Sequence, residues 1–281
     1  MKLLKRTKLN SKIFGLRKFV PVLVIAAITI VGVRVITASH AASINSVGAS
    51  VNATGKTLQN WPCSNCILRI PPTYNPSKPT ILLVALHGDE GTPTVIEPAW
   101  QPYTDKYNAI LFAPHCPVNL GCSFSNGSGG MTSSWWGWLQ YSSQYSGGWI
   151  GTQVSKIEAK YNINKSREYL TGWSGGADYL GDYALLHGNR FAAVAYVAGG
   201  VPYVQSCPAG KMAAYFLMGT NDFRYDSGQP GQVKQVFSRC GDPTTMVVLP
   251  GEDHTGTINA IGSQDYGDII MKWFLAHPLV K

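Results

Sequence analysis

The chain has few charged residues and no acidic residue near its start. Only 14% of its 281 residues are charged, whereas 45% are apolar, and this balance excludes an intrinsically disordered protein. Residues 1–42 hold eight Lys and Arg and no Asp or Glu, which accounts for the whole net charge of +8. The other 15 basic residues are balanced by 15 acidic ones. This distribution argues against a basic nucleic-acid-binding domain, so no nucleic-acid partner is expected.

The apolar run behind these basic residues is short for a membrane span. Residues 19–33 carry no charge, and as a helix they would extend about 22 Å, against a hydrocarbon core of about 30 Å. Small residues follow, as at a signal-peptidase site. We expect residues 1–42 to be a secretory signal cleaved after Ala41 or Ala42; the alternative is a retained anchor through residues 19–37. Both outcomes place the body outside the cytoplasm, because the basic flank stays inside.

Cysteines are few and even in number: Cys63, Cys66, Cys116, Cys122, Cys207 and Cys240. Six cysteines suit an oxidising compartment and up to three disulfides. We expect neighbours along the chain to pair, although the sequence leaves all fifteen pairings open. Cys63 and Cys66 could instead form half of a zinc site. No second close pair or histidine follows at the spacing that zinc sites use, so no metal is expected.

The chain has no internal repeat, and its body follows a small, polar segment. We expect residues 43–60 to be a linker and residues 61–281 to be one domain. Mostly continuous apolar runs recur at 80–86, 109–113, 168–171, 191–198, 213–218 and 244–249. Such runs favour strands buried on both faces of a parallel sheet, and helical patterns lie between them, at 150–161 and 270–277. The alternation predicts an α/β domain with helices on both faces of the sheet.

One long segment, residues 117–148, shows neither pattern and is rich in Gly, Ser and aromatic residues. A loop of this length in a compact domain is usually functional or disordered, and Trp135, Trp136 and Trp138 argue against disorder. Together with Trp173 they are candidate substrate-binding residues, because flat aromatic faces suit sugar rings and polymer chains. The alternative is that these tryptophans pack the loop into the core.

Gly172-Trp173-Ser174-Gly175-Gly176 is the one G-x-S-x-G motif in the chain. It lies between an apolar run and a helical pattern, which is the context of a nucleophile elbow. Such a turn strains the backbone of Ser174, and side chains at positions 172 and 176 would collide with the neighbouring strand and helix. We interpret Ser174 as a nucleophile; the alternative is a structural serine in a Gly-rich turn.

A nucleophilic serine needs a base, and the base needs an acid that orients it. In a fold with this elbow the partners follow in the order Ser, Asp or Glu, His, each after a later strand. Asp222 follows the fifth apolar run and His254 follows the sixth, so we predict Asp222 as the acid and His254 as the base. Asp226 is the alternative acid, because a loop can shift by a few residues. The other histidines are expected in the export segment, the core or the surface.

The oxyanion of the reaction needs two backbone N–H donors. One should come from Gly175, directly after the nucleophile. The second should come from the loop that follows the first long apolar run, where Asp89 stands in the segment LHGDEG. The alternative for this loop is an ordinary glycine turn that ends a strand.

These segments resemble the secreted α/β-hydrolase esterases that include polyhydroxybutyrate depolymerases and feruloyl and acetyl-xylan esterases. The similar stretches are LLVALHGDEG, SWWGW, KYNINKSREYLTGWSGGADY, GTNDFRY and PGEDHTG, and they cover most of residues 78–257. The resemblance implies an α/β-hydrolase fold. It also implies the same roles for the site residues: Ser174 as nucleophile, His254 as base, Asp222 as its orienter, and Asp89 and Gly175 as oxyanion donors.

The chain departs from this family at two positions. Family members often have Ala after the nucleophile, where this chain has Gly175, and Trp after the catalytic His, where it has Thr255. The first departure matters little for catalysis, because only the backbone N–H is used there, and the second concerns the substrate more than the chemistry.

The sequence therefore predicts an exported, monomeric serine esterase that needs no cofactor. Its expected substrates are small or polymeric carboxylic esters of acyl-polysaccharide, feruloyl, acetyl or polyhydroxyalkanoate type. A serine peptidase of the same fold, and a non-catalytic binding module on a hydrolase scaffold, are the alternatives.

Overall fold

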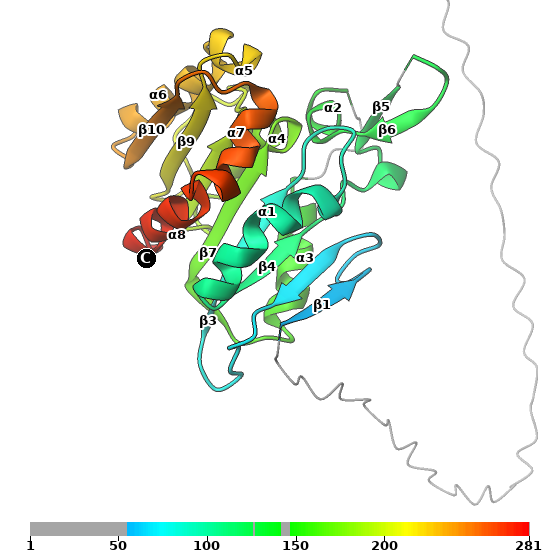
Figure 1. The fold of residues 1–281 in the computed structure, drawn as a ribbon, viewed down its shortest axis with the longest axis vertical. Helices are drawn as coiled ribbons and strands as arrows, with labels where there is room; N and C mark the ends of the chain where they lie inside the picture. Colours follow the sequence, from blue (N-terminus) through cyan, green and yellow to red (C-terminus); the bar gives the residue numbers. More distant parts are fainter. Residues whose placement is uncertain (1–54, 126, 142–146, 281) are drawn as a thin grey trace, which may run out of the picture. The chain divides into compact units, whose positions relative to one another are not determined.

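The computed structural model describes residues 55–125, 127–141 and 147–280. An eight-stranded sheet forms its centre, in the order β1-β2-β4-β3-β7-β8-β9-β10 (Figure 1). The strands are β1 (Lys56–Gln59), β2 (Ile67–Ile70), β3 (Thr80–Leu86), β4 (Ala109–Ala113), β7 (Ile163–Trp173), β8 (Ala193–Val197), β9 (Ala213–Gly219) and β10 (Thr244–Leu249). The pairings β1–β2 and β2–β4 are antiparallel, and all the others are parallel. The predicted mostly parallel sheet is thus confirmed.

Helices cover both faces of this sheet, as predicted (Figure 1). One face packs against α1 (Pro93–Lys106), α7 (His254–Ser263) and α8 (Tyr266–Ala276). The other packs against α2 (Trp135–Tyr141), α3 (Trp149–Glu158), α4 (Gly175–Leu186) and α6 (Gln229–Arg239). Strands β3, β4 and β9 are buried at every residue because both of their faces are covered.

Neighbouring residues on β9 illustrate the two cores. Tyr215 points to the first face, where its ring lies 5.4 Å from that of Trp273 on α8. Phe216 points to the second face and stacks on Tyr196 of β8, with ring centroids 4.7 Å apart. Because successive side chains of a strand alternate between faces, an unbroken apolar run supplies both cores at once.

Strand β1 corrects the predicted linker at residues 43–60. Its register runs from Lys56 opposite Ile70 to Gln59 opposite Ile67, so the folded domain begins before residue 61. The polar sequence of these residues did not indicate a strand. The strand lies at an edge of the sheet, where all its residues but Leu58 are exposed. The predicted signal or anchor, residues 1–42, lies outside the described residues. Within the described part of the chain, no helix combines the length and apolar character needed to cross a membrane.

Residues 117–148, expected to be a loop, contain several short elements. They include the 3-10 helix η1 (Val118–Leu120), the hairpin of β5 (Ser123–Ser125) and β6 (Met131–Ser133), and α2. The helix α2 was not predicted. Two tryptophans three positions apart in a glycine- and serine-rich segment do not by themselves indicate a helix.

The cysteines pair as neighbours, as expected. The disulfides are Cys63–Cys66, Cys116–Cys122 and Cys207–Cys240. The alternative of a zinc half-site at the first pair is therefore wrong.

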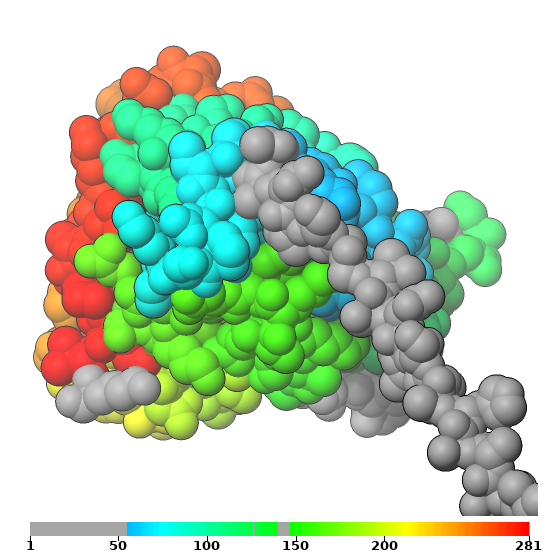
Figure 2. Space-filling view, turned by 90° about the horizontal axis from the view of Figure 1, so that it is seen from below, coloured from blue at the N-terminus to red at the C-terminus, as the bar shows by residue number. Residues whose placement is uncertain are grey.

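The amino-terminal ends of the parallel strands β3, β4 and β7–β10 lie on one side of the sheet, which Figure 2 shows from below. The segment before β3 (cyan), the start of β7 (green) and the carboxyl-terminal residues (red) meet there. The Thr80 N–H donates to the carbonyl of Asn162 at 2.8 Å, and the Leu279 N–H donates to the carbonyl of Ser166 at 2.9 Å. The candidate site lies at the opposite edge, after the carboxyl ends of β3, β7, β9 and β10.

Candidate active site

Ser174 occupies the sharp turn between β7 and α4. Its backbone has φ 54° and ψ −124°, a strained conformation for a residue with a side chain. A Cβ at Gly172 would lie 2.6 Å from the backbone of Gly176, and one at Gly176 would lie 2.5 Å from the carbonyl of His87. The predicted steric need for both glycines is therefore confirmed, and the turn presents the Ser174 hydroxyl at the end of the sheet.

Three predicted side chains meet at this turn. The Ser174 Oγ lies 2.8 Å from Nε2 of His254, the first residue of α7. The Nδ1 of His254 lies 3.0 and 3.1 Å from the two carboxylate oxygens of Asp222, which follows β9 and is fully buried. Asp226, the alternative acid, ends the short helix α5 (Phe223–Asp226) and is exposed. The chain thus brings a hydroxyl, an imidazole and a carboxylate into one line of hydrogen bonds.

An ion pair beside Asp222, between Arg224 and Asp178, was not predicted from the sequence. The backbone N–H of Arg224 donates to Oδ1 of Asp222 at 2.9 Å, and its guanidinium Nη1 lies 2.6 Å from Oδ2 of Asp178 on α4. The other oxygen of Asp178 accepts the N–H of Gly200 at 2.8 Å. Burial raises the pKa of Asp178 to about 6, and the Arg224 guanidinium offsets only part of this rise. This pair joins the loop of the acid to the helix of the nucleophile.

The residue after the nucleophile, Gly175, packs directly against Asp89. As the first residue of α4, Gly175 has a backbone N–H that no helix carbonyl can accept. A Cβ at Gly175 would lie 2.2 Å from the carboxyl carbon of Asp89. An alanine at this position would therefore force the Asp89 carboxyl to move, because that carboxyl fills the space that the methyl group would need.

The Asp89 carboxyl is held by the start of α2. The Trp136 N–H donates to its Oδ1 at 3.4 Å. Burial raises the pKa of Asp89, and the neighbouring Ser134 hydroxyl and the N–H groups of Trp135 and Trp136 oppose that rise. Asp89 thus connects the loop after β3 to the segment that contains the tryptophans.

The predicted substrate-binding tryptophans differ in how exposed they are. Trp135 and Trp138 are fully buried, with rings 5.2 and 6.0 Å from Tyr179 of α4. Their predicted role at a substrate rim is wrong for this reason, and the alternative of core packing is correct. They lie three positions apart on one side of α2, whereas Trp136 projects to another side and is half-buried.

Two aromatic residues flank the His254 ring. Trp173, a predicted site residue, is half-buried, and its ring lies 5.5 Å from the imidazole. Phe223, which the sequence interpretation missed, is 60% exposed and its ring lies 4.9 Å from the imidazole. Its position directly after Asp222, in the loop that carries the predicted acid, was the available signal.

Two curated proteins are similar to the chain in sequence. Feruloyl esterase C of Emericella nidulans is 25% identical over 247 residues, which cover 75% of this chain and 83% of that protein. Feruloyl esterase B of Neurospora crassa is 30% identical over 174 residues, which cover 56% of this chain and 51% of that protein. The chain therefore spans about half the length of the second relative. No protein-family model matches the chain.

Solved structures share the fold at low sequence identity. An S-formylglutathione hydrolase from Agrobacterium tumefaciens superposes with a TM-score of 0.59 at 12% identity, over 75% of this chain and 89% of that one. The doubly covered sheet, the elbow between β7 and α4, and the solved structures show that the chain has the α/β-hydrolase fold. The similarity to the two esterases supports a carboxylic ester hydrolase.

Proposed function

We propose that the chain is an exported serine esterase whose catalytic triad is Ser174, His254 and Asp222. The observation that carries this proposal is the continuous hydrogen-bonded line from the Ser174 hydroxyl through His254 to Asp222. The three disulfides support export, because such bonds persist in oxidising compartments.

In the proposed reaction, the Ser174 oxygen attacks the ester carbonyl while Nε2 of His254 takes its proton. The backbone N–H groups of Asp89 and Gly175 stabilise the tetrahedral oxyanion. The imidazolium then protonates the leaving alcohol, which departs and leaves an acyl-serine. Water attacks this acyl group, gives a proton to His254, and releases the acid as Ser174 recovers its hydrogen. Asp222 stabilises the imidazolium throughout.

The proposed substrates are carboxylic esters of acyl-polysaccharide, feruloyl, acetyl or polyhydroxyalkanoate type. Both curated relatives are named feruloyl esterases, which favours an aromatic acyl group among these. The exposed ring of Phe223 and the half-buried rings of Trp136 and Trp173 offer apolar surface around the triad.

Replacing Ser174 by Ala tests the nucleophile. We expect the S174A variant to lose about 10⁴-fold or more in kcat on p-nitrophenyl acetate, with an unchanged melting temperature. The wild-type chain should also react with a fluorophosphonate probe, and S174A should not. Wild-type turnover by S174A would overturn the assignment. An unreactive wild-type chain would instead favour the non-catalytic binding module.

Paired substitutions test the acid. Asp222→Asn should lower kcat about 10⁴-fold, because the amide favours the wrong tautomer of His254. The matched control, Asp226→Asn, changes an exposed carboxyl four positions later and should leave kcat unchanged. The reverse result would assign the acid to Asp226.

A panel of feruloyl, acetyl and hydroxyalkanoate esters, with peptides beside them, separates the esterase from a serine peptidase.

A further inference from the structure

The histidine that opens the loop after β3 is fixed at both ring nitrogens. We call residues 87–91 the oxyanion loop. His87 is fully buried, and the backbone N–H of Cys116 donates to its Nε2 at 3.2 Å. A nitrogen that accepts a hydrogen bond carries no proton, so the ring proton is on Nδ1. That Nδ1–H donates to the carbonyl of Gly88 at 2.7 Å.

These bonds orient the peptide group between Gly88 and Asp89. The Gly88 carbonyl also accepts the N–H of Gly91 at 3.1 Å. In a trans peptide the N–H points away from the carbonyl, so the Asp89 N–H is directed away from His87 and Gly91. Gly88 itself lies against the nucleophile, since a Cβ placed on it would be 3.2 Å from Cβ of Ser174. The carbonyl bonds therefore set the direction of a proposed oxyanion donor.

The far end of the oxyanion loop is anchored through β6. The Glu90 N–H donates to the Ser133 carbonyl at 2.7 Å, and the Ser133 hydroxyl donates to the Gly91 carbonyl at 2.9 Å. Ser134, whose hydroxyl lies beside the Asp89 carboxyl, donates its backbone N–H to the carbonyl of Cys122 at 3.2 Å. This side of the loop thus depends on the position of Cys122.

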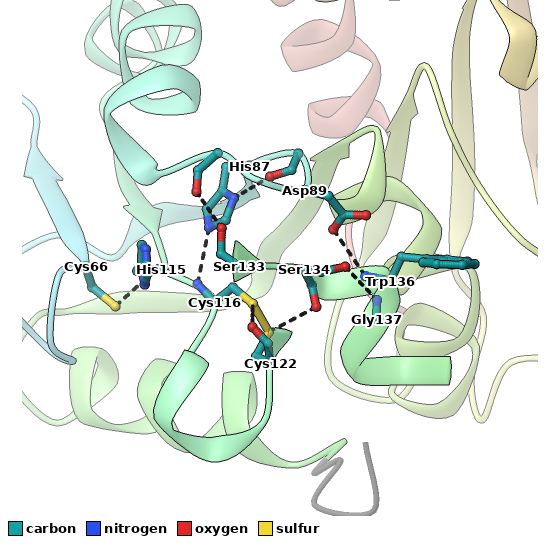
Figure 3. The surroundings of a disulfide bond; sticks show 12 residues. Cys66, His87, Asp89, His115, Cys116, Cys122, Ser133, Ser134, Trp136 and Gly137 are labelled. Atoms are coloured by element: carbon teal, nitrogen blue, oxygen red, sulfur yellow. Dashed lines mark hydrogen bonds between the residues drawn. A yellow bond between two sulfur atoms is a disulfide. The ribbon is translucent and has the colours of Figure 1, made fainter. Parts of the chain in front are cut away.

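The two anchors belong to one disulfide. Figure 3 shows the bond between Cys116 and Cys122, with His87 connected to the first cysteine and Ser134 to the second. Both cysteines are fully buried. The bond closes a ring over a separation of only six residues, so it fixes the Cys116 N–H and the Cys122 carbonyl relative to each other.

We propose that the Cys116–Cys122 disulfide is a positioning element of the esterase, which holds the oxyanion loop so that the Asp89 N–H faces the nucleophile. This inference rests on the proposed function. It makes full turnover depend on formation of this one disulfide, so that a chain with the two free thiols would fold but hydrolyse esters slowly.

The ionisation of His87 is compatible with this role. Burial lowers its pKa to about 4, with a smaller contribution from His115 and an opposing one from the Gly88 carbonyl. The ring therefore stays neutral at the pH of an ester assay, and the Cys116 N–H keeps its acceptor.

Two disulfide deletions form the test. The C116A/C122A variant should lose about tenfold or more in kcat on p-nitrophenyl acetate, because an oxyanion donor is misaligned, with KM within about twofold. The control, C207A/C240A, removes a bond that spans 33 residues. Since longer loops gain more from cross-linking, the control should lose more in Tm than C116A/C122A and keep its kcat.

The result is decisive in either direction. Unchanged kcat in a folded C116A/C122A variant overturns the inference, and so does an equal loss of kcat in both variants, which would indicate general loosening. Failure of the proposed function is distinguishable, because it would appear as turnover by S174A whatever the state of the disulfide.

A second pair of variants applies if C116A/C122A does not fold. His87→Phe removes both ring nitrogens and keeps an aromatic ring in the core, and it should lower kcat about tenfold with KM within about twofold. The control is His115→Phe at a half-buried ring 5.5 Å away, and it should keep its kcat. Equal kcat in the two variants overturns the inference.

Discussion

Gly175 and Asp89 depend on each other. The side chain of one occupies the space beside the Cα of the other, with 2.2 Å between the Asp89 carboxyl carbon and the place of a Cβ at Gly175. Overpacking of this kind costs typically about 1–3 kcal/mol. The cost in stability of a substitution at one of these two positions should therefore depend on which residue stands at the other.

We expect Gly175→Ala to reduce the free energy of unfolding by about 1–3 kcal/mol, as measured by urea denaturation. In the D89A background the same substitution should cost much less, because the carboxyl is gone. Gly262→Ala is the control, since a Cβ there meets nothing within 4 Å and α7 gains helix propensity. Equal costs of Gly175→Ala in the two backgrounds would contradict the steric explanation.

The motif residues were predictable, but their supporting contacts were not. Ser174, Asp222 and His254 follow strands in an order typical of the fold, so spacing along the chain predicted that these side chains would meet, as they do. Arg224 and Asp178 are 46 positions apart and meet only after β7, β8 and β9 have paired. A single sequence carries no pattern for such a pair.

At the scale of secondary-structure elements, the Arg224–Asp178 pair joins α5 to α4. Breaking a buried pair leaves an uncompensated charge, which typically costs about 3–5 kcal/mol. The side chain of Asp178 is fully buried and that of Arg224 is 19% exposed. The pair therefore holds the loop that carries Asp222 against α4, the helix that follows Ser174.

Burial of the Asp178 carboxyl should give stability a specific pH dependence, which Arg224 reduces and does not cause. The folded-state pKa of Asp178, about 6, lies above its ordinary value of 3.8, so folding favours the protonated acid. The stability from this protonation is complete below about pH 4 and is lost as pH rises through 6. Asp178→Asn is neutral at every pH, so its free energy of unfolding relative to wild type should rise between pH 4 and 6. Parallel pH curves for the two proteins would refute this account.

Most strands that the sequence predicted are buried on two faces. Strands β3, β4, β8 and β9 appear as apolar runs because both cores need apolar side chains. The edge strand β10 also appears as an apolar run, although only Leu249 in it is buried. The strands β1 and β2 and the helix α2 were missed. Most side chains of β1 contact solvent, and β2 is only four residues long, with Arg69 interrupting its apolar residues. In α2, buried tryptophans stand in a segment whose composition is typical of a loop.

At the scale of the whole molecule, the distribution of charge supports a proposal about processing. If residues 1–42 are a cleaved signal, the protein recovered from culture medium should begin at Ala42 or Ser43, as measured by intact mass. A retained anchor would instead give the uncleaved chain in the membrane fraction. Cleavage would also remove all eight basic residues of the segment and leave a body of zero formal charge.

The proposed triad is assembled across long distances in sequence. Ser174 and His254 are 80 positions apart, and Asp222 precedes His254 by 32. Contacts of this separation form only when most of the sheet has paired. If the chain is exported as proposed, hydrolysis would therefore be a signal of completed folding, because a polypeptide held extended for translocation would have no assembled site. The cell that makes the chain would then be protected from it by geometry alone until the sheet has formed.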